Sequence, residues 1–213
     1  MKRVLSTSIS VGFATGLYGV SFGALATVAG LDILSVMLLS LLMFSGASQF
    51  AFIGVIASGG APISAIASSW LLGVRNSFYA LRLKAAIDPQ SLWRLLAAHL
   101  TIDESNAVSA AQDDLRAQKV GFWATGAAVF VFWNTATLLG ALVGDFMGSV
   151  EAWGLDAAAA AAFLGLVWPR LRGNEMLAIL ASAVALLGSV FLPAGVPILL
   201  TVLVALIPGG KKE

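Results

Sequence analysis

The sequence predicts an all-α, polytopic transmembrane helix bundle, and three observations lead to this prediction. Hydrophobic residues make up 59% of the 213 residues. Asp, Glu, Lys and Arg together make up only 11%, whereas a soluble domain carries about 25% charged residues. The apolar residues form continuous runs along the whole chain, without the alternation of a membrane β-barrel, so helices are the structure that fits them.

About seven or eight of these runs approach the length of a membrane-spanning helix, which is about 20 residues. The expected segments are 9–30, 33–57, 62–83, 92–112, 120–143, 154–168, 175–192 and 196–208. Broken or re-entrant helices are compatible with these runs. No hydrophilic stretch is long enough for a second domain, so residues 1–213 are expected to form one integral membrane domain.

A weak internal repeat suggests two related halves. Residues 14–16 and 124–126 are both Ala-Thr-Gly, and residues 30–32 and 154–156 are both Gly-Leu-Asp. Many transporters are built from related halves. The two offsets differ, however, and coincidence is the simpler explanation in a chain so rich in alanine and glycine.

The basic residues predict an orientation in the membrane. They gather at four segment ends, as Lys2 and Arg3, Arg116 and Lys119, Arg170 and Arg172, and Lys211 and Lys212. With eight crossings all four ends lie on one side, and the opposite side holds Asp32, Asp88, Asp145 and Glu151, with Arg94 as its main cation. The positive-inside rule then makes both termini cytoplasmic in a multi-pass protein.

The residue inventory excludes several kinds of site. There is no cysteine, so the chain has no disulfide and no cysteine-based metal or redox centre. His99 is the single histidine, which excludes a poly-histidine metal site. Neither a nucleotide-binding glycine loop nor a nucleophile with a suitable base is recognisable. We therefore expect no enzyme activity, no cofactor and no metal.

The first segment has a face of small residues. Gly12, Gly16, Gly19 and Gly23 follow steps of four, three and four, which place them on one side of a helix. Such a face lets a second helix approach closely, which is how helices associate in lipid. Tight packing is the main interpretation. The alternative is a smooth wall of a substrate path.

The second segment is interrupted by polar and small residues at its centre. Ser45, Gly46, Ser48 and Gln49 follow each other there, with Ala47 between them. Helices broken near the middle of the membrane often present backbone groups to a polar substrate, and Gln49 offers both a donor and an acceptor. An intact helix with an interhelical hydrogen bond is the equal alternative. We treat the four residues as candidate substrate ligands.

The third segment contains Arg75, followed by Asn76, after a long apolar run. A cation at membrane depth is costly and usually faces protein or a watery cavity, where the planar guanidinium can hold a carboxylate. Arg75 and Asn76 are therefore candidate substrate ligands. If the helix ends here instead, Arg75 extends to the membrane surface, as Arg82 and Lys84 are expected to do.

The fourth segment is amphipathic. His99, Asp103 and Asn106 follow i, i+4, i+7 spacing and are expected to share one stripe of a continuous helix, with Glu104 about 100° away. Asp103, Glu104 and His99 are candidates for proton coupling or for a counter-charge to Arg75. The alternative is a helix that lies on the membrane surface with this face in water.

These residues carry a resemblance to the AzlC family, the large subunit of bacterial branched-chain amino acid exporters, over nearly the full chain. The resemblance rests on blocks at 22–26, 44–50, 75–79, 101–104 and 154–156. The Ser-Gly-Ala-Ser-Gln-Phe run of the second block and the Asp-Glu pair of the fourth are its most specific parts.

The resemblance implies export of valine, leucine, isoleucine and perhaps methionine from the cytoplasm by a secondary transporter in the bacterial inner membrane. It also implies proton coupling and a small membrane partner similar to AzlD, and no nucleic acid. The alternative is a channel-like or non-transporting membrane subunit of a larger assembly, although no selectivity filter is recognisable in the sequence.

Overall fold

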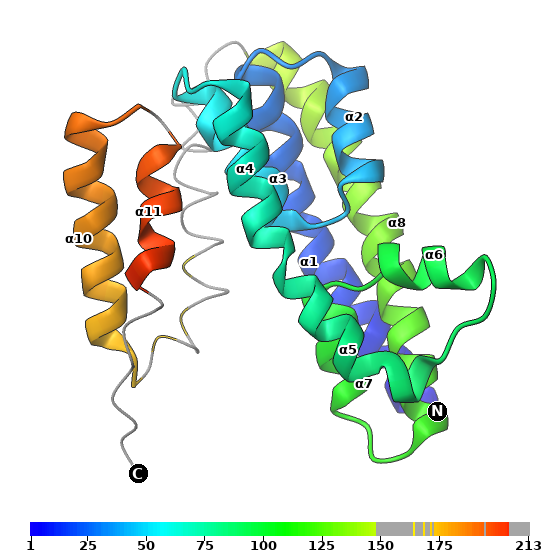
Figure 1. Ribbon diagram of the computed structural model, residues 1–213. Coiled ribbons are helices and arrows are strands. Elements are labelled where there is room, and N and C mark those ends of the chain that lie inside the picture. The colour runs from blue at the N-terminus through cyan, green and yellow to red at the C-terminus, as the bar shows by residue number, and fades with distance from the viewer. Residues whose placement is uncertain (148–163, 165–167, 169–170, 172, 194, 205–213) are drawn as a thin grey trace.

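The computed structural model describes residues 1–147, 164, 168, 171, 173–193 and 195–204 (Figure 1). All regular secondary structure in this part of the chain is helical, which confirms the all-α prediction. Most of the expected segment 154–168 and the second Gly-Leu-Asp repeat lie outside the described residues. The basic residues Arg170, Arg172, Lys211 and Lys212 lie outside them as well.

Two long helices, α1 (Lys2–Val28) and α8 (Leu115–Met147), run side by side along the bundle (Figure 1). The two helices are parallel, because the residue numbers of their contacting positions increase in the same direction along both helices. The Thr125 hydroxyl donates to the Ser8 hydroxyl at 2.9 Å near one end, and α1 residues past 20 meet α8 residues past 136 near the other. Both helices are long and apolar enough to cross a membrane, as judged by length and composition.

The small residues of α1 lie at its contact with α8. Gly12, Gly16, Gly19 and Gly23 all belong to this contact. A Cβ atom on Gly12 would fall 2.6 Å from the Cβ of Ala128 and 2.9 Å from its backbone carbonyl carbon. The two backbones therefore approach each other more closely than side chains on α1 would allow, as in other helix pairs packed in lipid.

The expected second segment is divided into α2 (Ile33–Leu42) and α3 (Gly46–Ala57). Asp32 caps α2, because its carboxylate accepts a hydrogen bond of 2.8 Å from the Ser35 N–H. The backbone N–H and hydroxyl of Ser35 hold the pKa of that exposed carboxyl below its ordinary range. α2 enters the bundle from the end where α1 finishes, and α3 returns to the same end (Figure 1). Residues 33–57 thus form a re-entrant hairpin.

Contacts with α8 give the depth at which this hairpin turns. On α2, the Ser40 hydroxyl donates to the Thr137 hydroxyl at 3.3 Å. At the start of α3, Gly46 lies against the ring of Trp133, one helical turn earlier on α8. The turn between the two helices therefore lies beside the middle of α8.

Gln49 holds the two halves of the α2–α3 hairpin together. Its side chain is fully buried, and its Nε2 donates to the Leu39 carbonyl at 3.1 Å and to the Met43 carbonyl at 3.0 Å. These carbonyls lie at the end of α2, where the Leu39 carbonyl also accepts the Met43 N–H at 2.9 Å and the Met43 carbonyl accepts the Ser45 N–H. A polar side chain from α3 thus satisfies the end of α2.

The next two helices, α4 (Pro62–Gly73) and α5 (Arg75–Ile87), lead from the end of α3 to the end of the bundle that holds the N-terminus (Figure 1). They meet at Val74, which keeps helical dihedral angles of −54° and −34°. Pro62 occupies the first turn of α4, where its missing N–H costs no hydrogen bond. The expected segment 62–83 corresponds to this pair.

A second hairpin enters from the opposite end. Its first helix is α6 (Trp93–His99). The ring centroid of Trp93, the first residue of this helix, lies 5.8 Å from that of Trp123 on α8. The ring centroid of His99, the last residue of α6, lies 5.6 Å from that of Phe130 on α8. Since Phe130 lies about two turns farther along α8 than Trp123, α6 rises toward the middle of the bundle.

The returning helix is α7 (Asp103–Ala110). Leu100, just before it, packs against Gly126 of α8, whereas near its end the Ser109 hydroxyl donates to the Gln118 carbonyl at 2.9 Å. α7 therefore runs back toward the start of α8, as Figure 1 also shows.

The break between α6 and α7 corrects the prediction of a single amphipathic helix over 92–112. His99 ends α6 and Asp103 begins α7, so these two residues do not share a stripe of one helix. Only Asp103 and Asn106 lie on a common helix. The i, i+4 spacing misled the prediction because residues 100–102 leave the helical path between them.

The two hairpins also change the end of the bundle at which some of the loops between helices lie. α1 and α8 begin, and α5 ends, at the same end of the bundle, so Lys2, Lys84 and Lys119 are grouped there (Figure 1). The interval with Asp88 and Arg94, expected on the opposite side, follows α5 and lies at this end instead. The reason is that residues 33–57 return without crossing.

The last described helices are α10 (Glu175–Phe191) and α11 (Val196–Val204). They pack on each other, with Gly188 against Pro197. Gly195, with a left-handed φ of +91°, lies against Ser64 of α4 and so ties this pair to the rest of the bundle.

Candidate functional site

The turns of the two hairpins meet inside the bundle. Phe44, at the turn between α2 and α3, has its ring centroid 5.6 Å from that of His99, at the end of α6. Both rings also touch Phe130 of α8, at 5.1 Å for Phe44 and 5.6 Å for His99. This contact brings two interrupted helices from opposite ends of the bundle to one depth.

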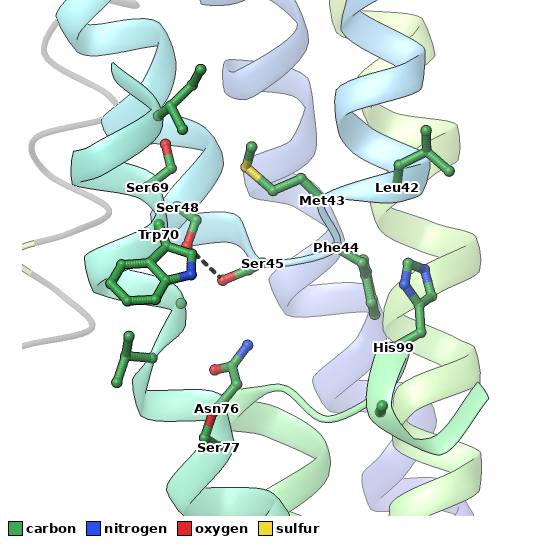
Figure 2. A pocket seen from close by; sticks show the side chains of 14 residues that line it. Leu42, Met43, Phe44, Ser45, Ser48, Ser69, Trp70, Asn76, Ser77 and His99 are labelled. Carbon is green, nitrogen blue, oxygen red and sulfur yellow. Dashed lines mark hydrogen bonds between the residues drawn. The ribbon is translucent and has the colours of Figure 1, made fainter. Parts of the chain in front are cut away.

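An open pocket of about 510 Å³ lies beside this contact (Figure 2). Its walls come from the α2–α3 turn, from α4, from the start of α5 and from the end of α6. The polar lining residues are Ser45, Ser48, Ser69, Asn76, Ser77 and His99, and the apolar ones are Leu42, Met43, Phe44, Ile66, Trp70, Gly73, Val74 and Ala98. The lining therefore combines hydroxyl and amide groups with a larger apolar area.

The N-terminus of α3 faces this pocket. Ser45 precedes the helix in an extended conformation, with φ −155° and ψ 97°, and no side chain caps the helix. The Ser45 and Ser48 hydroxyls bond each other at 3.1 Å and both line the pocket. The first N–H groups of an α-helix have no acceptor within it and carry the positive end of its dipole. An anionic or carbonyl group in the pocket would be favoured here.

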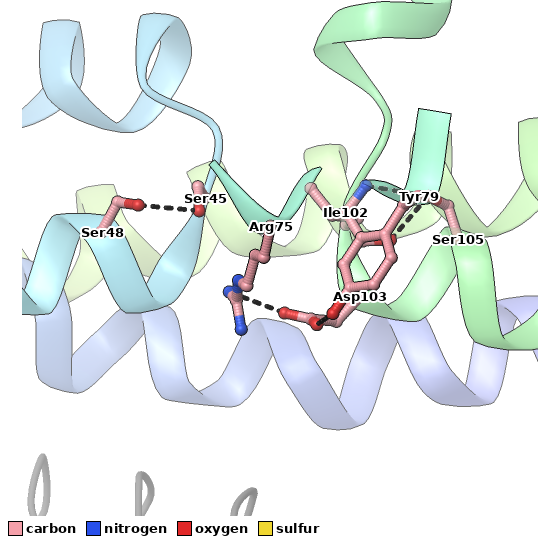
Figure 3. Close-up of polar contacts among 7 residues, drawn as sticks. All are labelled: Ser45, Ser48, Arg75, Tyr79, Ile102, Asp103 and Ser105. Carbon is pink, nitrogen blue, oxygen red and sulfur yellow. Dashed lines mark hydrogen bonds and ion pairs between the residues drawn. The ribbon is translucent and has the colours of Figure 1, made fainter. Parts of the chain in front are cut away.

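A cluster of charged and polar groups lies next to the pocket, between α5 and α7 (Figure 3). The Arg75 guanidinium is 2.7 Å from one oxygen of the Asp103 carboxylate. The Tyr79 hydroxyl donates to the other oxygen at 2.6 Å. Arg75 and Tyr79 are one helical turn apart on α5, so both reach the same carboxylate. We call Arg75, Tyr79 and Asp103 the α5–α7 clamp.

Arg75 retains donor capacity beyond this clamp. Its Nε atom is buried and has no hydrogen-bond partner in the described part of the chain. The neighbours of Arg75 in sequence, Val74 and Asn76, both line the pocket. The Asn76 Oδ1 atom is likewise buried without a partner among the described residues.

The start of α7 is held by hydroxyl groups. The Ser105 hydroxyl accepts the Ile102 N–H at 3.1 Å and donates to the Leu100 carbonyl at 2.6 Å. Asp103 and Glu104 occupy the first turn, where the helix dipole favours negative charge. The Glu104 carboxyl faces α1 near Thr15.

The candidate ligands from the sequence divide into three groups. Ser45, Ser48, Asn76 and His99 line the pocket. Arg75 and Asp103 form the clamp beside it, with Glu104 on the side that faces α1. Gly46 and Gln49 do not line the pocket, since Gly46 packs on Trp133 and Gln49 bonds the end of α2.

Several residues of the site were not identified from the sequence. Ser69, Trp70 and Ser77 line the pocket, and Phe44 forms part of the contact between the hairpins. Tyr79 belongs to the clamp. For Tyr79 a signal was present, because it follows Arg75 by four residues and therefore lies on the same helical face.

Within the described residues, no three His, Cys, Asp or Glu side chains are grouped closely enough to hold a metal ion. The described residues of the site offer hydroxyl, amide, carboxylate, guanidinium and backbone groups. Such groups bind and orient a polar solute, and a carboxylate also accepts and releases protons.

Comparisons with known proteins agree with a membrane protein. The family model described as AzlC protein matches residues 10–147. A protein from Helicobacter pylori strain J99, described as an uncharacterized membrane protein, is 27% identical over 180 residues, which cover 81% of this chain and 76% of that protein. No solved structure matches the chain significantly.

Proposed function

The chain belongs to the AzlC family, and from this premise we propose that it is a secondary transporter that exports valine, leucine and isoleucine, and perhaps methionine, from the bacterial cytoplasm. The observation that carries the proposal is the position of the pocket, which lies beside two interrupted helices and an ion pair inside a membrane protein. Interrupted helices near the middle of the membrane are a common substrate site in secondary transporters.

The pocket suits the parts of a branched-chain amino acid. Such a molecule carries a carboxylate, an ammonium group and a short aliphatic side chain. The uncapped start of α3, with Ser45 and Ser48, offers N–H and hydroxyl donors to the carboxylate. The Asn76 side chain lines the pocket, and its amide oxygen, which has no partner among the described residues, is the acceptor we assign to the ammonium group. Apolar side chains such as Ile66 and Trp70 leave room for the aliphatic group.

Arg75 is the second candidate ligand for the substrate carboxylate. In the structure it is bound to Asp103, so the substrate would have to share or replace that carboxylate. Its unpartnered Nε supports the first arrangement, in which Arg75 keeps Asp103 and contributes one more donor.

The proposed surroundings of the transporter follow from the family and from the charges. We place the chain in the cytoplasmic (inner) membrane, with the N-terminus and C-terminus in the cytoplasm. The basic residues at the ends of α1, α5 and α8 support the placement of the N-terminus. The family premise adds a small membrane subunit similar to AzlD and coupling to protons.

Efflux of labelled valine, leucine and isoleucine from cells tests the proposal. Cells that produce this chain together with the adjacent small membrane protein should release the label faster than cells without the chain. Equal efflux from both would contradict an exporter. Passage of the solutes that does not saturate with concentration would instead favour the channel-like alternative.

A further inference from the structure

Two adjacent carboxylates begin α7, and the structure gives them different surroundings. Asp103 is held by the clamp, with the Arg75 guanidinium at 2.7 Å on one oxygen and the Tyr79 hydroxyl at 2.6 Å on the other. Glu104 lies about 100° around the helix and faces α1. Among the described residues, no Lys, Arg or His makes an ion pair with Glu104.

The charged groups around Glu104 are few. Asp103 on α7 and Arg75 on α5 are the charges that act on it, and they are already paired with each other. From α1 it meets Thr15, and the cations of α1, Lys2 and Arg3, lie at least about 18 Å away along the helix axis.

Of the other helices that pack on α7, α5 also carries Arg82 and Lys84, and α8 carries Arg116 and Lys119 near its start. None of these four cations makes an ion pair with Glu104 in the described part of the chain. α8 has no Asp, Glu, Lys, Arg or His between residues 120 and 144, and α2, α3 and α4 have none at all. His99 ends α6, where its ring packs between Phe44 and Phe130. Within the described residues, Glu104 is thus a carboxyl group that faces α1 and is paired with no cation.

We propose that Glu104 is the proton-coupling residue of the transporter and that Asp103 is a positioning residue, which holds Arg75 and joins α5 to α7. This inference rests on the proposed function, because it assigns the coupling step within it. Both oxygens of Asp103 are engaged, by the Arg75 guanidinium and the Tyr79 hydroxyl, so this side chain serves to hold α5 and α7 together. An unpaired carboxyl at membrane depth can take up a proton from one side and release it to the other as its surroundings change.

The division of roles predicts a difference between exchange and proton-driven transport. Exchange of labelled for unlabelled leucine across a membrane needs substrate binding and the conformational change, but no net proton movement. Accumulation driven by a pH gradient needs the proton site as well. A variant that lacks only the proton site should therefore keep the first activity and lose the second.

The experiment uses proteoliposomes that contain the full chain with its small partner subunit. Glu104→Gln should retain leucine counterflow within about twofold and lose accumulation driven by a pH gradient by more than about tenfold. Asp103→Asn should lose both activities, because it breaks the clamp. Glu104→Asp, which keeps a carboxyl group, should retain both.

The proposal is overturned if Glu104→Gln still accumulates leucine under a pH gradient. It is also overturned if Glu104→Gln loses counterflow together with accumulation, since Glu104 would then serve binding or folding.

A second measurement on the unaltered protein does not depend on the folding of a variant. Dicyclohexylcarbodiimide reacts with protonated carboxyl groups in an apolar environment. Mass spectrometry of the treated protein should locate the adduct on Glu104 and not on Asp103. An adduct on Asp103 alone, or on neither residue, would contradict the assignment. Absence of any leucine transport by the unaltered protein would contradict the proposed function, whereas the labelling would still test the difference between the two carboxylates.

Discussion

At the scale of single residues, the α5–α7 clamp is the clearest polar feature of the bundle. Both oxygens of Asp103 are engaged, by Arg75 at 2.7 Å and by Tyr79 at 2.6 Å. Bonds between charged groups of this length are among the strongest in proteins, and low dielectric strengthens them further. The clamp links α5 to α7, the returning helix of the hairpin that enters from the N-terminal end.

Removal of the Tyr79 hydroxyl should destabilise the protein measurably. A hydrogen bond to a charged group contributes about 1.5–3 kcal/mol, so Tyr79→Phe should lower the thermal stability of the detergent-solubilised protein. Tyr18→Phe is the matched control, because Tyr18 is exposed on α1. Thermal unfolding followed by fluorescence measures both. Equal midpoints for the two variants would show that the Tyr79 hydroxyl does not help to hold α5 to α7.

The sequence predicted some of these residues and missed others for a physical reason. Arg75 and Asp103 stand out because a charge within an apolar run is costly in a membrane. Ser69 and Ser77 do not stand out, because serine is common in membrane helices as a helix-packing residue. Their place in the pocket depends on which faces of α4 and α5 turn toward the α2–α3 turn, which spacing along one helix does not reveal.

At the scale of the elements, the α2–α3 hairpin depends on Gln49. Gln49→Leu has a similar size but removes the side-chain hydrogen bonds to the carbonyls of Leu39 and Met43, which keep only their backbone donors. Each lost hydrogen bond costs about 0.5–1.5 kcal/mol. The variant should therefore unfold at a lower temperature and transport less. Gln90→Leu, at an exposed position before α6, is the control and should behave as the unaltered protein. Identical behaviour of the two variants would contradict this role of Gln49.

The contact between α1 and α8 depends on the absence of side chains. A Cβ atom on Gly140 would collide with the backbone carbonyl of Val20, and one on Gly12 with the backbone of Ala128. Gly140→Ala should therefore destabilise the protein by about 1–3 kcal/mol through overpacking. Gly54→Ala is the matched control, because nothing lies within 4 Å of its added Cβ. Equal thermal stability of the two variants would argue against close packing of these helices.

The break in the second segment was predictable, but its direction was not. Ser45 to Gln49 interrupt an apolar run, which favours two half-helices. Whether the second half continues across the membrane or turns back depends on contacts such as Gly46 with Trp133, which join residues far apart in the sequence. The break at 100–102 was missed because spacing counts assume one continuous helix.

At the scale of the whole molecule, the two hairpins enter from opposite ends and meet at Phe44 and His99. Each one returns to its own side, so each removes one crossing from the simple count. After both hairpins, the start of α8 lies on the same side as it would if every expected segment crossed the membrane once. This explains how Arg116 and Lys119 lie at the expected end although the loop with Asp88 does not.

Cysteine labelling tests this arrangement cleanly, because the chain has no cysteine of its own. A membrane-impermeant maleimide should reach Ser58→Cys from the side opposite the N-terminus, and Gln90→Cys from the N-terminal side. Asp113→Cys is the control, since both topologies place it on the N-terminal side. Simple crossings by residues 33–57 and 92–112 would exchange the sides of Ser58 and Gln90, and that result would contradict the hairpins.

The central claim is that the pocket between the hairpin turns, α4 and α5 binds the transported amino acid. Ser77 lines the pocket and is exposed, so Ser77→Cys should react with a small thiol reagent. Leucine at saturating concentration should slow this reaction several-fold in proteoliposomes that transport leucine. It should leave the reaction of Ser58→Cys, outside the pocket, unchanged. An unchanged rate at Ser77→Cys in protein that still transports leucine would contradict the claim.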